Sequence, residues 1–346
     1  MPEDAREKLR KWFLKVKRDF PWRIDTSPYR VWISEIMLQQ TRASYVVEYF
    51  ENWMLKYPTL SDLASAPEEE IIKSWEGLGY YNRARNIRRA AKYFLSKHQG
   101  QIPATKEELI EVPGLGPYTV GAILSFSFHQ KAPAVDGNVA RVISRFFCIE
   151  EDISSTATQK KIYQKTLDFL PDIKPYQVME GLIELGATLC SKAPRCELCP
   201  LRKKCRAYQE DKQNTLPIKK TRRKMVKLFK EVAVINSLKK FLVFRHPEGK
   251  VLGGLYEFIS RDRCDNDLRQ PSWGEILGVD LKKKEDFGVH RYTFTHHDVE
   301  LFPSMWETDR HFHLDGCEWR SFQELFTLPF SAGHKRILAT LAKASL

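Results

Sequence analysis

Four of the seven cysteines crowd into one short stretch of the chain, at positions 190, 196, 199 and 205. Thiolates at this spacing can close round a single centre, and both a zinc ion and a 4Fe–4S cluster accept four cysteine ligands. Zinc ribbons usually bring two cysteine pairs from separate hairpins, whereas this stretch is one compact loop. The spacing therefore favours iron–sulfur, with zinc and unrelated free thiols as the other interpretations.

Two carboxylates stand in contexts that suit acid–base or electrostatic chemistry. Glu35 lies inside the apolar stretch 31–38, where partial desolvation would raise its pKa and make it a usable general acid. The alternative is a carboxylate that faces solvent or is held by an arginine. Asp136 precedes a predicted helix in the stretch 134–141, and its context predicts an N-cap. A capping aspartate kept ionised by backbone N–H groups would also suit electrostatic catalysis, provided that it faces a second carboxylate.

A glycine-rich turn at 112–122 is the fourth candidate. Gly114 and Gly116 flank Leu115, and the next helix is predicted to begin at Pro117. Unpaired N–H groups at such a turn and helix start can hold a phosphate. A plain helix–helix turn explains the same residues, since glycine turns are common.

The elements that must position these residues divide the chain in two. Residues 1–207 are predicted to be almost entirely helical, with amphipathic segments such as 3–18 and 31–40 punctuated by prolines. The polar, basic stretch 208–230 suits an interdomain linker. Residues 231–346 then read as an α+β domain, with short apolar strands and a closing helix. The strands are expected at 232–235, 241–244, 289–294 and 299–302, and the helix at 333–344.

Composition limits the function classes. The chain of 346 residues is 42% hydrophobic and 29% charged, which fits a folded soluble protein and excludes wholesale disorder. Lysine and arginine total 56 against 44 aspartates and glutamates, and the resulting net charge of +12 suggests a polyanionic partner. No apolar run is long enough to cross a bilayer, and the first residues lack the apolar core of a signal peptide. We therefore expect a cytoplasmic protein without an export signal, nucleoid-associated if bacterial, that makes no use of a membrane.

Several motifs together resemble the adenine DNA glycosylase (MutY) family of the helix-hairpin-helix glycosylase superfamily. They are the stretches 27–41 and 77–86, the turn at 112–122, the tetrapeptide 135–138 and the four cysteines. The resemblance covers nearly the whole chain. It implies an all-α helix-hairpin-helix domain with an iron–sulfur loop at 190–205, followed by a Nudix-like lesion-recognition domain. It also implies a monomer that flips adenine out of double-stranded DNA and excises it hydrolytically where it is mispaired with 8-oxoguanine or guanine, in base excision repair.

The resemblance assigns roles to individual residues. Those implied in catalysis are Glu35, Asp136, Asn138 and Tyr118. Those implied in binding DNA or the two mispaired bases are Trp22, Arg23, Gln39, Tyr80, Glu180, Gly114, Gly116, Phe294, Thr295 and His296. The implied ligands of a 4Fe–4S cluster are Cys190, Cys196, Cys199 and Cys205.

The sequence departs from the family pattern at two places. The family usually has serine where Thr295 stands, so the hydroxyl is kept and a methyl is added. Five residues separate Cys190 from Cys196, one fewer than is usual in the family. A true Nudix hydrolase also needs a glutamate-rich helix, and residues 269–284 contain a single glutamate, Glu275, so we do not expect pyrophosphatase activity.

Three functional hypotheses follow. The first is a monofunctional adenine glycosylase, because the related glycosylase/lyases place a nucleophilic lysine where this chain has Tyr118. The second is a related glycosylase with lyase activity or another target base, such as thymine mispaired with guanine. The third is a DNA-binding scaffold without catalysis, which the presence of both Glu35 and Asp136 disfavours.

Overall fold

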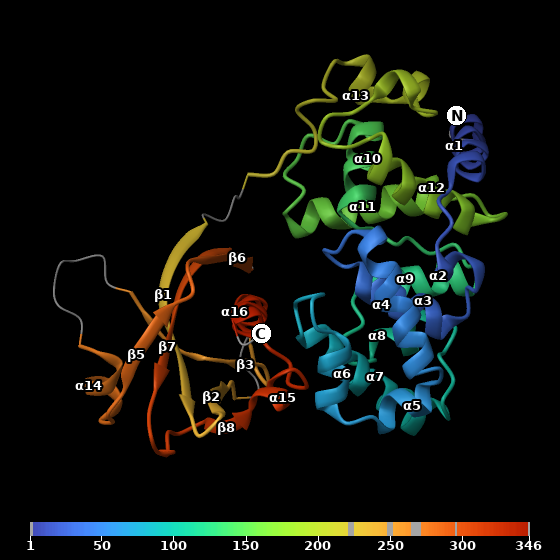
Figure 1. Ribbon diagram of the computed structural model, residues 1–346. Helices are drawn as coiled ribbons and strands as arrows, with labels where there is room; N and C mark the ends of the chain where they lie inside the picture. Colours follow the sequence, from blue (N-terminus) through green and yellow to red (C-terminus); the bar gives the residue numbers. More distant parts are fainter. Residues whose placement is uncertain (1–2, 221–224, 248–251, 264–270, 295, 345–346) are drawn as a thin grey trace. The chain divides into compact units, whose positions relative to one another are not determined.

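The computed structural model describes residues 3–220, 225–247, 252–263, 271–294 and 296–344 (Figure 1). Contacts within the chain divide it into two compact units. The first unit comprises Met1–Ala66 and Asn86–Arg222, and the second comprises Pro67–Arg85 and Arg223–Leu346. The second unit therefore takes a short segment from the helical half of the sequence. No helix in the described residues is long and apolar enough to cross a membrane.

Helices build the first unit, and the described residues 3–220 contain no strand. The segment Pro67–Arg85, which belongs to the second unit, interrupts the first unit in sequence. The helices before this segment are α1 (Glu3–Val16), α2 (Pro21–Ile24), α3 (Pro28–Leu38), α4 (Ala43–Lys56) and α5 (Leu60–Ser65). Those after it are α7 (Asn82–His98), which begins in the second unit, α8 (Lys106–Ile110), α9 (Pro117–Ala122), α10 (Gly137–Phe147), α11 (Thr156–Phe169), α12 (Pro175–Thr188) and α13 (Arg206–Gln209). A π-helical turn, η1 (Ile123–Ser127), follows α9, and two 3₁₀ turns, η2 (Cys196–Leu198) and η3 (Arg202–Lys204), lie in the cysteine stretch.

Small residues allow the helices of the first unit to approach closely. The α1 helix buries Ala5, Leu9 and Phe13, which recur every four residues and form one apolar face. A Cβ atom at Gly181 of α12 would lie only 3.2–3.3 Å from Leu9 and Phe13. Further along α12, a Cβ at Gly186 would come within 2.6 Å of Asn138 in α10. Glycine therefore sets the close packing of α12 against its two neighbours.

A mixed sheet forms the centre of the second unit. Its main path runs β3-β2-β1-β7-β5, with β4 on β1, β6 on β7 and β8 on β2. The long strands β1 and β7 pair in parallel, and the remaining pairs are antiparallel. The strands are β1 (Val226–Ser237), β2 (Lys240–Arg245), β3 (Tyr256–Glu257), β4 (Ile259–Asp262), β5 (Lys282–Asp286), β6 (His290–Phe294), β7 (His297–Glu307) and β8 (Cys317–Ser321). The helices are α6 (Glu68–Ser74), α14 (Trp273–Leu277), α15 (Phe322–Leu325) and α16 (Ala332–Ala344).

The structure confirms the helical first part and the mixed second part of the chain. Three of the predicted strands lie within β1, β2 and β7, the predicted strand 289–294 begins one residue before β6, and the predicted closing helix lies within α16. Strands β3, β4, β5 and β8 were not predicted, and β5 shows why. Its sequence is charged throughout and all five residues are exposed, so it has no apolar pattern to reveal it. The expected linker 208–230 contains the end of α13 and the start of β1, because β1 pairs with β7 from Val226 onward.

Candidate active site

A cavity of about 1030 Å³ lies in the first unit. It is lined by the end of α1, by α2 and α3, and by parts of α9, α10 and α12. Eight of the residues assigned roles from the sequence line it: Trp22, Arg23, Glu35, Gln39, Tyr118, Asp136, Asn138 and Glu180. These eight residues, which span positions 22–180 of the chain, therefore meet around one cavity.

Glu35 is the buried acid of this cavity. It belongs to α3, in which every residue from Val31 to Met37 is buried, and its own exposure is 6%. Desolvation, together with the nearby Asp136 and Glu180 carboxylates, raises its pKa to about 7 against the opposing effects of the Tyr118 hydroxyl and Arg23. A large fraction of the carboxyl groups therefore still carries a proton near neutral pH, as a general acid requires.

Tyr118 is the hydrogen-bond partner of Glu35. It stands in the first turn of α9, directly after Pro117, and its hydroxyl donates to Oε2 of Glu35 over 2.5 Å. Burial raises the pKa of Tyr118 well above its usual value, and the Glu35 and Asp136 carboxylates act in the same direction. The phenol therefore stays protonated and serves as a donor that orients the Glu35 carboxyl group.

Asp136 caps the N-terminus of α10. Its carboxylate accepts the Val139 N–H over 2.7 Å and the Asn138 side-chain amide over 2.8 Å. Burial raises the pKa of Asp136, while these donors and Arg141 lower it, and the net direction is upward. The capping role and a place in the cavity thus occur together. Asn138 is itself fixed, because its Oδ1 accepts from Arg141 over 2.8 Å and α12 presents Gly186 against it.

An arginine–glutamate network forms another wall of the cavity. The guanidinium of Arg23 lies 3.2 Å from Glu180 and 2.9 Å from Glu184, and Arg18 lies 2.6 Å from Glu184. Burial raises the pKa of Glu180, against the opposing effect of Arg23. Sequence reasoning missed Arg18 and Glu184. The signal for Glu184 was its four-residue spacing from Glu180, which places both carboxylates on one face of a helix, whereas no pattern pointed to Arg18.

Two further predicted residues complete the lining. The buried ring of Trp22 stacks on Phe20 with centroids 4.8 Å apart and meets the edge of Phe50 at 5.4 Å. The side-chain amide of Gln39 donates to the Thr119 hydroxyl over 3.4 Å. Both side chains are thus fixed by neighbours within the first unit.

The remaining predicted binding residues do not line this cavity. Gly114 and Gly116 lie in the turn between α8 and α9, where Gly114 has φ +83° and a Cβ there would come within 2.5 Å of Asn86. Tyr80 belongs to the second unit and is 45% exposed.

Phe294 ends β6, paired with His297. Thr295 lies outside the described residues. The His296 ring lies 4.1 Å from the His297 ring.

The four clustered cysteines line one small cavity in the first unit, together with Arg145. Among the described residues, no three of their sulfurs lie within 4.8 Å of one another. A tetrahedral zinc ion with Zn–S bonds of about 2.3 Å would bring its sulfurs to about 3.8 Å. The four sulfurs are therefore spread more widely than a tetrahedral zinc ion would require. Arg145 donates to the Cys190 sulfur over 3.3 Å, which suits a thiolate ligand.

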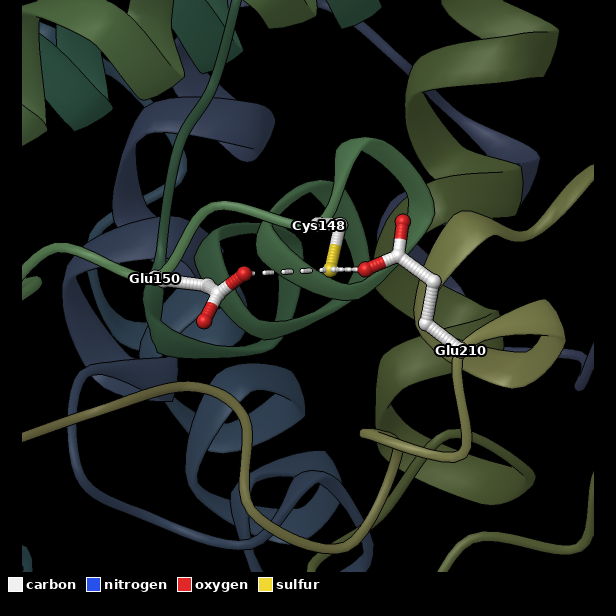
Figure 2. Close-up of side chains that lie close together, drawn as sticks. All are labelled: Cys148, Glu150 and Glu210. Atoms are coloured by element: carbon white, nitrogen blue, oxygen red, sulfur yellow. Dashed lines mark hydrogen bonds between the residues drawn. The ribbon is translucent and has the colours of Figure 1, made fainter.

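A second group of metal-ligand type side chains lies elsewhere in the first unit. Figure 2 shows the Cys148 sulfur between carboxylate oxygens of Glu150 and Glu210, at 4.0 and 3.3 Å. The Lys212 ammonium lies 2.7 Å from Glu150 and 3.0 Å from Glu210. The Arg206 guanidinium lies 3.3 Å from Glu210, so two cations face the two carboxylates, and the group is an ordinary surface ion-pair network.

Known proteins resemble the chain along most of its length. Residues 33–168 match the family described as HhH-GPD superfamily base excision DNA repair protein. The chain is 41% identical to the adenine DNA glycosylase of Homo sapiens over 221 residues, which are 61% of this chain and 40% of that protein. It is 32% identical to the adenine DNA glycosylase of Buchnera aphidicola subsp. Schizaphis graminum over 293 residues, or 83% and 82% of the two chains.

The fold likeness agrees with the sequence likeness. A thermostable thymine-DNA glycosylase superposes on 60% of this chain and 97% of its own, with a TM-score of 0.55 and 28% identity. The chain spans about two fifths of the length of the mammalian relatives it matches. The bacterial relative, in contrast, is matched along most of its own length, and the chain therefore belongs to the adenine DNA glycosylase family.

Proposed function

We propose that this protein is a monofunctional DNA N-glycosylase that hydrolytically excises adenine mispaired with 8-oxoguanine or guanine. The main observation behind the proposal is that two carboxyl groups with different surroundings, Glu35 and Asp136, line the same cavity. Glu35 keeps a proton near pH 7, and Asp136 is held by a backbone N–H and an amide. Glycoside hydrolysis uses such a pair around the bond that breaks.

Excision begins with proton transfer to the base. Glu35 gives its proton to N7 of the extruded adenine, so that the C1′–N9 bond can break with its electron pair leaving on a neutral base. The Tyr118 hydroxyl stays on Oε2 and stabilises the resulting carboxylate. Acid catalysis of this kind contributes about 10²–10⁴-fold to the rate.

The sugar then carries positive charge, and Asp136 provides the opposing negative charge. The carboxylate either stabilises the oxocarbenium ion electrostatically or forms a bond to C1′ that is broken later. Glu35, now deprotonated, takes a proton from the water that adds to C1′. The acid is thereby restored for the next turnover, and the products are free adenine and an abasic sugar.

The absence of a lysine at position 118 supports hydrolysis without strand cleavage. A lyase needs an amine that forms a Schiff base with C1′. The hydroxyl of Tyr118 is occupied by Glu35, and burial keeps the phenol protonated. Trp22, Arg23 and Glu180, which line the same cavity, would contact the adenine.

The remaining DNA contacts are proposals from the family resemblance. We infer that Gln39 and Tyr80 wedge into the base stack, that Gly114 and Gly116 hold the backbone, and that Phe294, Thr295 and His296 of a Nudix-like domain read 8-oxoguanine. Flipping costs a few kcal/mol, which such wedges offset. The protein is proposed to act as a cytoplasmic monomer on double-stranded DNA.

We also propose that Cys190, Cys196, Cys199 and Cys205 hold a 4Fe–4S cluster. The single compact loop and the wide spacing of the four sulfurs support this choice over zinc, and the Arg145 hydrogen bond to Cys190 suits a thiolate ligand of either metal. When bound, the cluster would cross-link the 190–205 loop through four sulfur–iron bonds. Basic residues 202–204 would then be presented on an ordered loop, available to phosphates.

A single-turnover assay on four duplexes tests the function. The duplexes carry adenine opposite 8-oxoguanine, adenine opposite guanine, adenine opposite thymine, and thymine opposite guanine. We expect excision from the first two, fastest opposite 8-oxoguanine, and no borohydride-trapped adduct. Excision of thymine, or a trapped adduct at the level of a known lyase, would contradict the proposal.

A further inference from the structure

A buried carboxylate links the segment Pro67–Arg85 to the core of the second unit. Glu76 is only 7% exposed, although it takes no part in the proposed chemistry. Its Oε1 accepts the backbone N–H of Phe330 over 3.1 Å, and its Oε2 lies 2.8 Å from the Lys335 ammonium. Phe330 is itself buried and bridges to Tyr256 of β3. Glu76 therefore reaches the sheet core from a position 254 residues away in the chain.

Other contacts fasten the same segment. Lys73, which lies 3.0 Å from Glu76, donates to the Leu328 carbonyl over 3.0 Å. At the other end of the segment, the buried guanidinium of Arg85 donates to the carbonyl of Gly253. The stretch from Glu76 to Arg85 is thus attached at both ends to residues of the C-terminal half of the sequence.

Tyr80 stands at the middle of this doubly anchored stretch. The backbone is left-handed at Gly77, Gly79 and Tyr80, with φ of +108°, +70° and +50°. The Trp75 indole donates to the Gly79 carbonyl over 3.0 Å, and the Arg83 guanidinium lies over the Tyr80 ring at 5.7 Å. A tyrosine in this conformation is strained and persists because the surroundings fix it.

We propose that Glu76 is a positioning residue for Tyr80, and that the choice between oxidised and ordinary guanine depends on this anchor. The inference rests on the proposed function, in which Tyr80 wedges into the base stack at the mispair. A wedge discriminates between bases only if its position is fixed relative to the strands that read the lesion. Glu76 supplies that fixed relation, because it binds Phe330 in the core on which the proposed reading strand β6 is built.

The anchor also changes the interpretation of a truncation. Removal of residues 231–346 would take away Phe330, Lys335 and Gly253 and would leave Glu76 and Arg85 without these partners. The loss of lesion preference in such a truncated protein would then report on Tyr80 as well as on the missing domain. Point variants in the full chain separate the two effects.

The experiment measures the ratio of single-turnover excision rates opposite 8-oxoguanine and opposite guanine, in the full-length protein. Glu76→Ala should lower this ratio about tenfold and leave the rate opposite guanine nearly unchanged, since the coupling between Glu76 and Tyr80 is lost and the chemistry is not. Tyr80→Ala should lower the ratio similarly, and the double variant should be no worse than Tyr80→Ala alone. Glu285→Ala, on exposed strand β5 of the same unit, is the matched control.

Hydrogen exchange of the free protein provides a second readout. Glu76→Ala should speed amide exchange in residues 76–85, and Glu76→Gln, which keeps an acceptor for the Phe330 N–H, should restore part of the protection. If Glu76→Ala does not fold, Glu76→Gln and Lys335→Met carry the same comparison. Equal loss of both excision rates, or additive effects of Glu76→Ala and Tyr80→Ala, would overturn the inference. A wild-type ratio near one would overturn the proposed lesion preference and the inference with it, whereas a preference that survives Glu76→Ala overturns the inference alone.

Discussion

Each unit of the molecule buries a glutamate, and the two carboxyl groups are held in opposite states. Glu35 and Glu257 are 6% and 8% exposed. Burial raises the pKa of both, but among the described residues Glu35 accepts one hydrogen bond, from Tyr118, and has two carboxylate neighbours, so its pKa reaches about 7. For Glu257, His334 and His246 outweigh the desolvation, and the pKa falls to about 2.

The difference lies in the partners of each group. The His246 and His334 rings lie 3.0 and 3.7 Å from Glu257. His334 accepts the Phe258 N–H at Nδ1, so its Nε2 carries the proton that faces Glu257. Depth of burial therefore does not decide the charge of an acid. A buried acid with few hydrogen-bond donors has a raised pKa and can act as a proton donor. A buried acid with several donors has a lowered pKa, stays ionised and stabilises the fold.

The largest effect is expected when the acidic proton of Glu35 is removed by substitution. Glu35→Gln should lower the single-turnover excision rate by about 10²–10⁴-fold while duplex affinity changes little, because shape is kept and the acid is lost. Glu257→Gln is the matched substitution in the second unit and should leave the rate of bond cleavage unchanged. A Glu35→Gln protein that loses affinity as strongly as rate would break the comparison.

The pH dependence of excision should report the Glu35 proton. With a folded pKa of about 7, the carboxyl group is protonated below that pH and ionised above it. The single-turnover rate should therefore fall about tenfold per pH unit well above pH 7. Rates measured from pH 5.5 to 9 on one duplex test this, and a rate that stays flat to pH 9 would exclude Glu35 as the acid.

Removal of the Tyr118 hydroxyl should raise the pKa of Glu35 further and widen its difference from the pKa of Glu257. Tyr118→Phe deletes the hydroxyl that lowers the pKa of Glu35. The alkaline limb of the pH–rate profile should therefore move to higher pH, and the maximal rate should fall roughly tenfold with the loss of one oriented hydrogen bond. Tyr29→Phe, at a phenol that donates to the Tyr57 carbonyl, is a control from the same unit. A limb that moves to lower pH would show that the hydroxyl acts differently.

The smallest effect on catalysis, and a clear one on stability, is expected at Glu257. Its pKa is lowered from 4.5 to about 2 on folding, so its ionised form stabilises the protein above pH 4.5, and this stabilisation is lost as pH falls towards 2. Glu257→Gln should reduce the free energy of unfolding by about 1–3 kcal/mol at neutral pH. Urea unfolding at several pH values should show the gap to wild type closing in acid; a gap that widens in acid would contradict the assignment.

The sequence predicted those features of the site that depend on residues close together in the chain. The apolar neighbours of Glu35 predicted its burial, and the Asp-Gly-Asn context of Asp136 predicted its N-cap, which the structure contains. The parallel pairing of β1 with β7 and the charged edge strand β5 could not be predicted, because tertiary contacts define them and no apolar pattern does.

The same limit applies to the candidate site. Glu184 and Glu76 look like ordinary surface acids in the sequence, and their roles depend on partners far along the chain, Arg18 and Phe330. Long-range partners of this kind are fixed by the fold as a whole. A motif search therefore finds reactive residues more easily than it finds the residues that hold them in place.

The central claim is that Glu35 keeps a proton at neutral pH in the free protein. It can be measured directly by carbon-13 NMR of protein labelled at the glutamate side-chain carboxyl, with Glu35→Gln used to assign the resonance. We predict that the wild-type resonance titrates with a midpoint near pH 7, as the desolvated site requires. A midpoint close to the ordinary value of 4.5 would show that Glu35 is ionised when DNA arrives, and the proposed acid catalysis would be wrong.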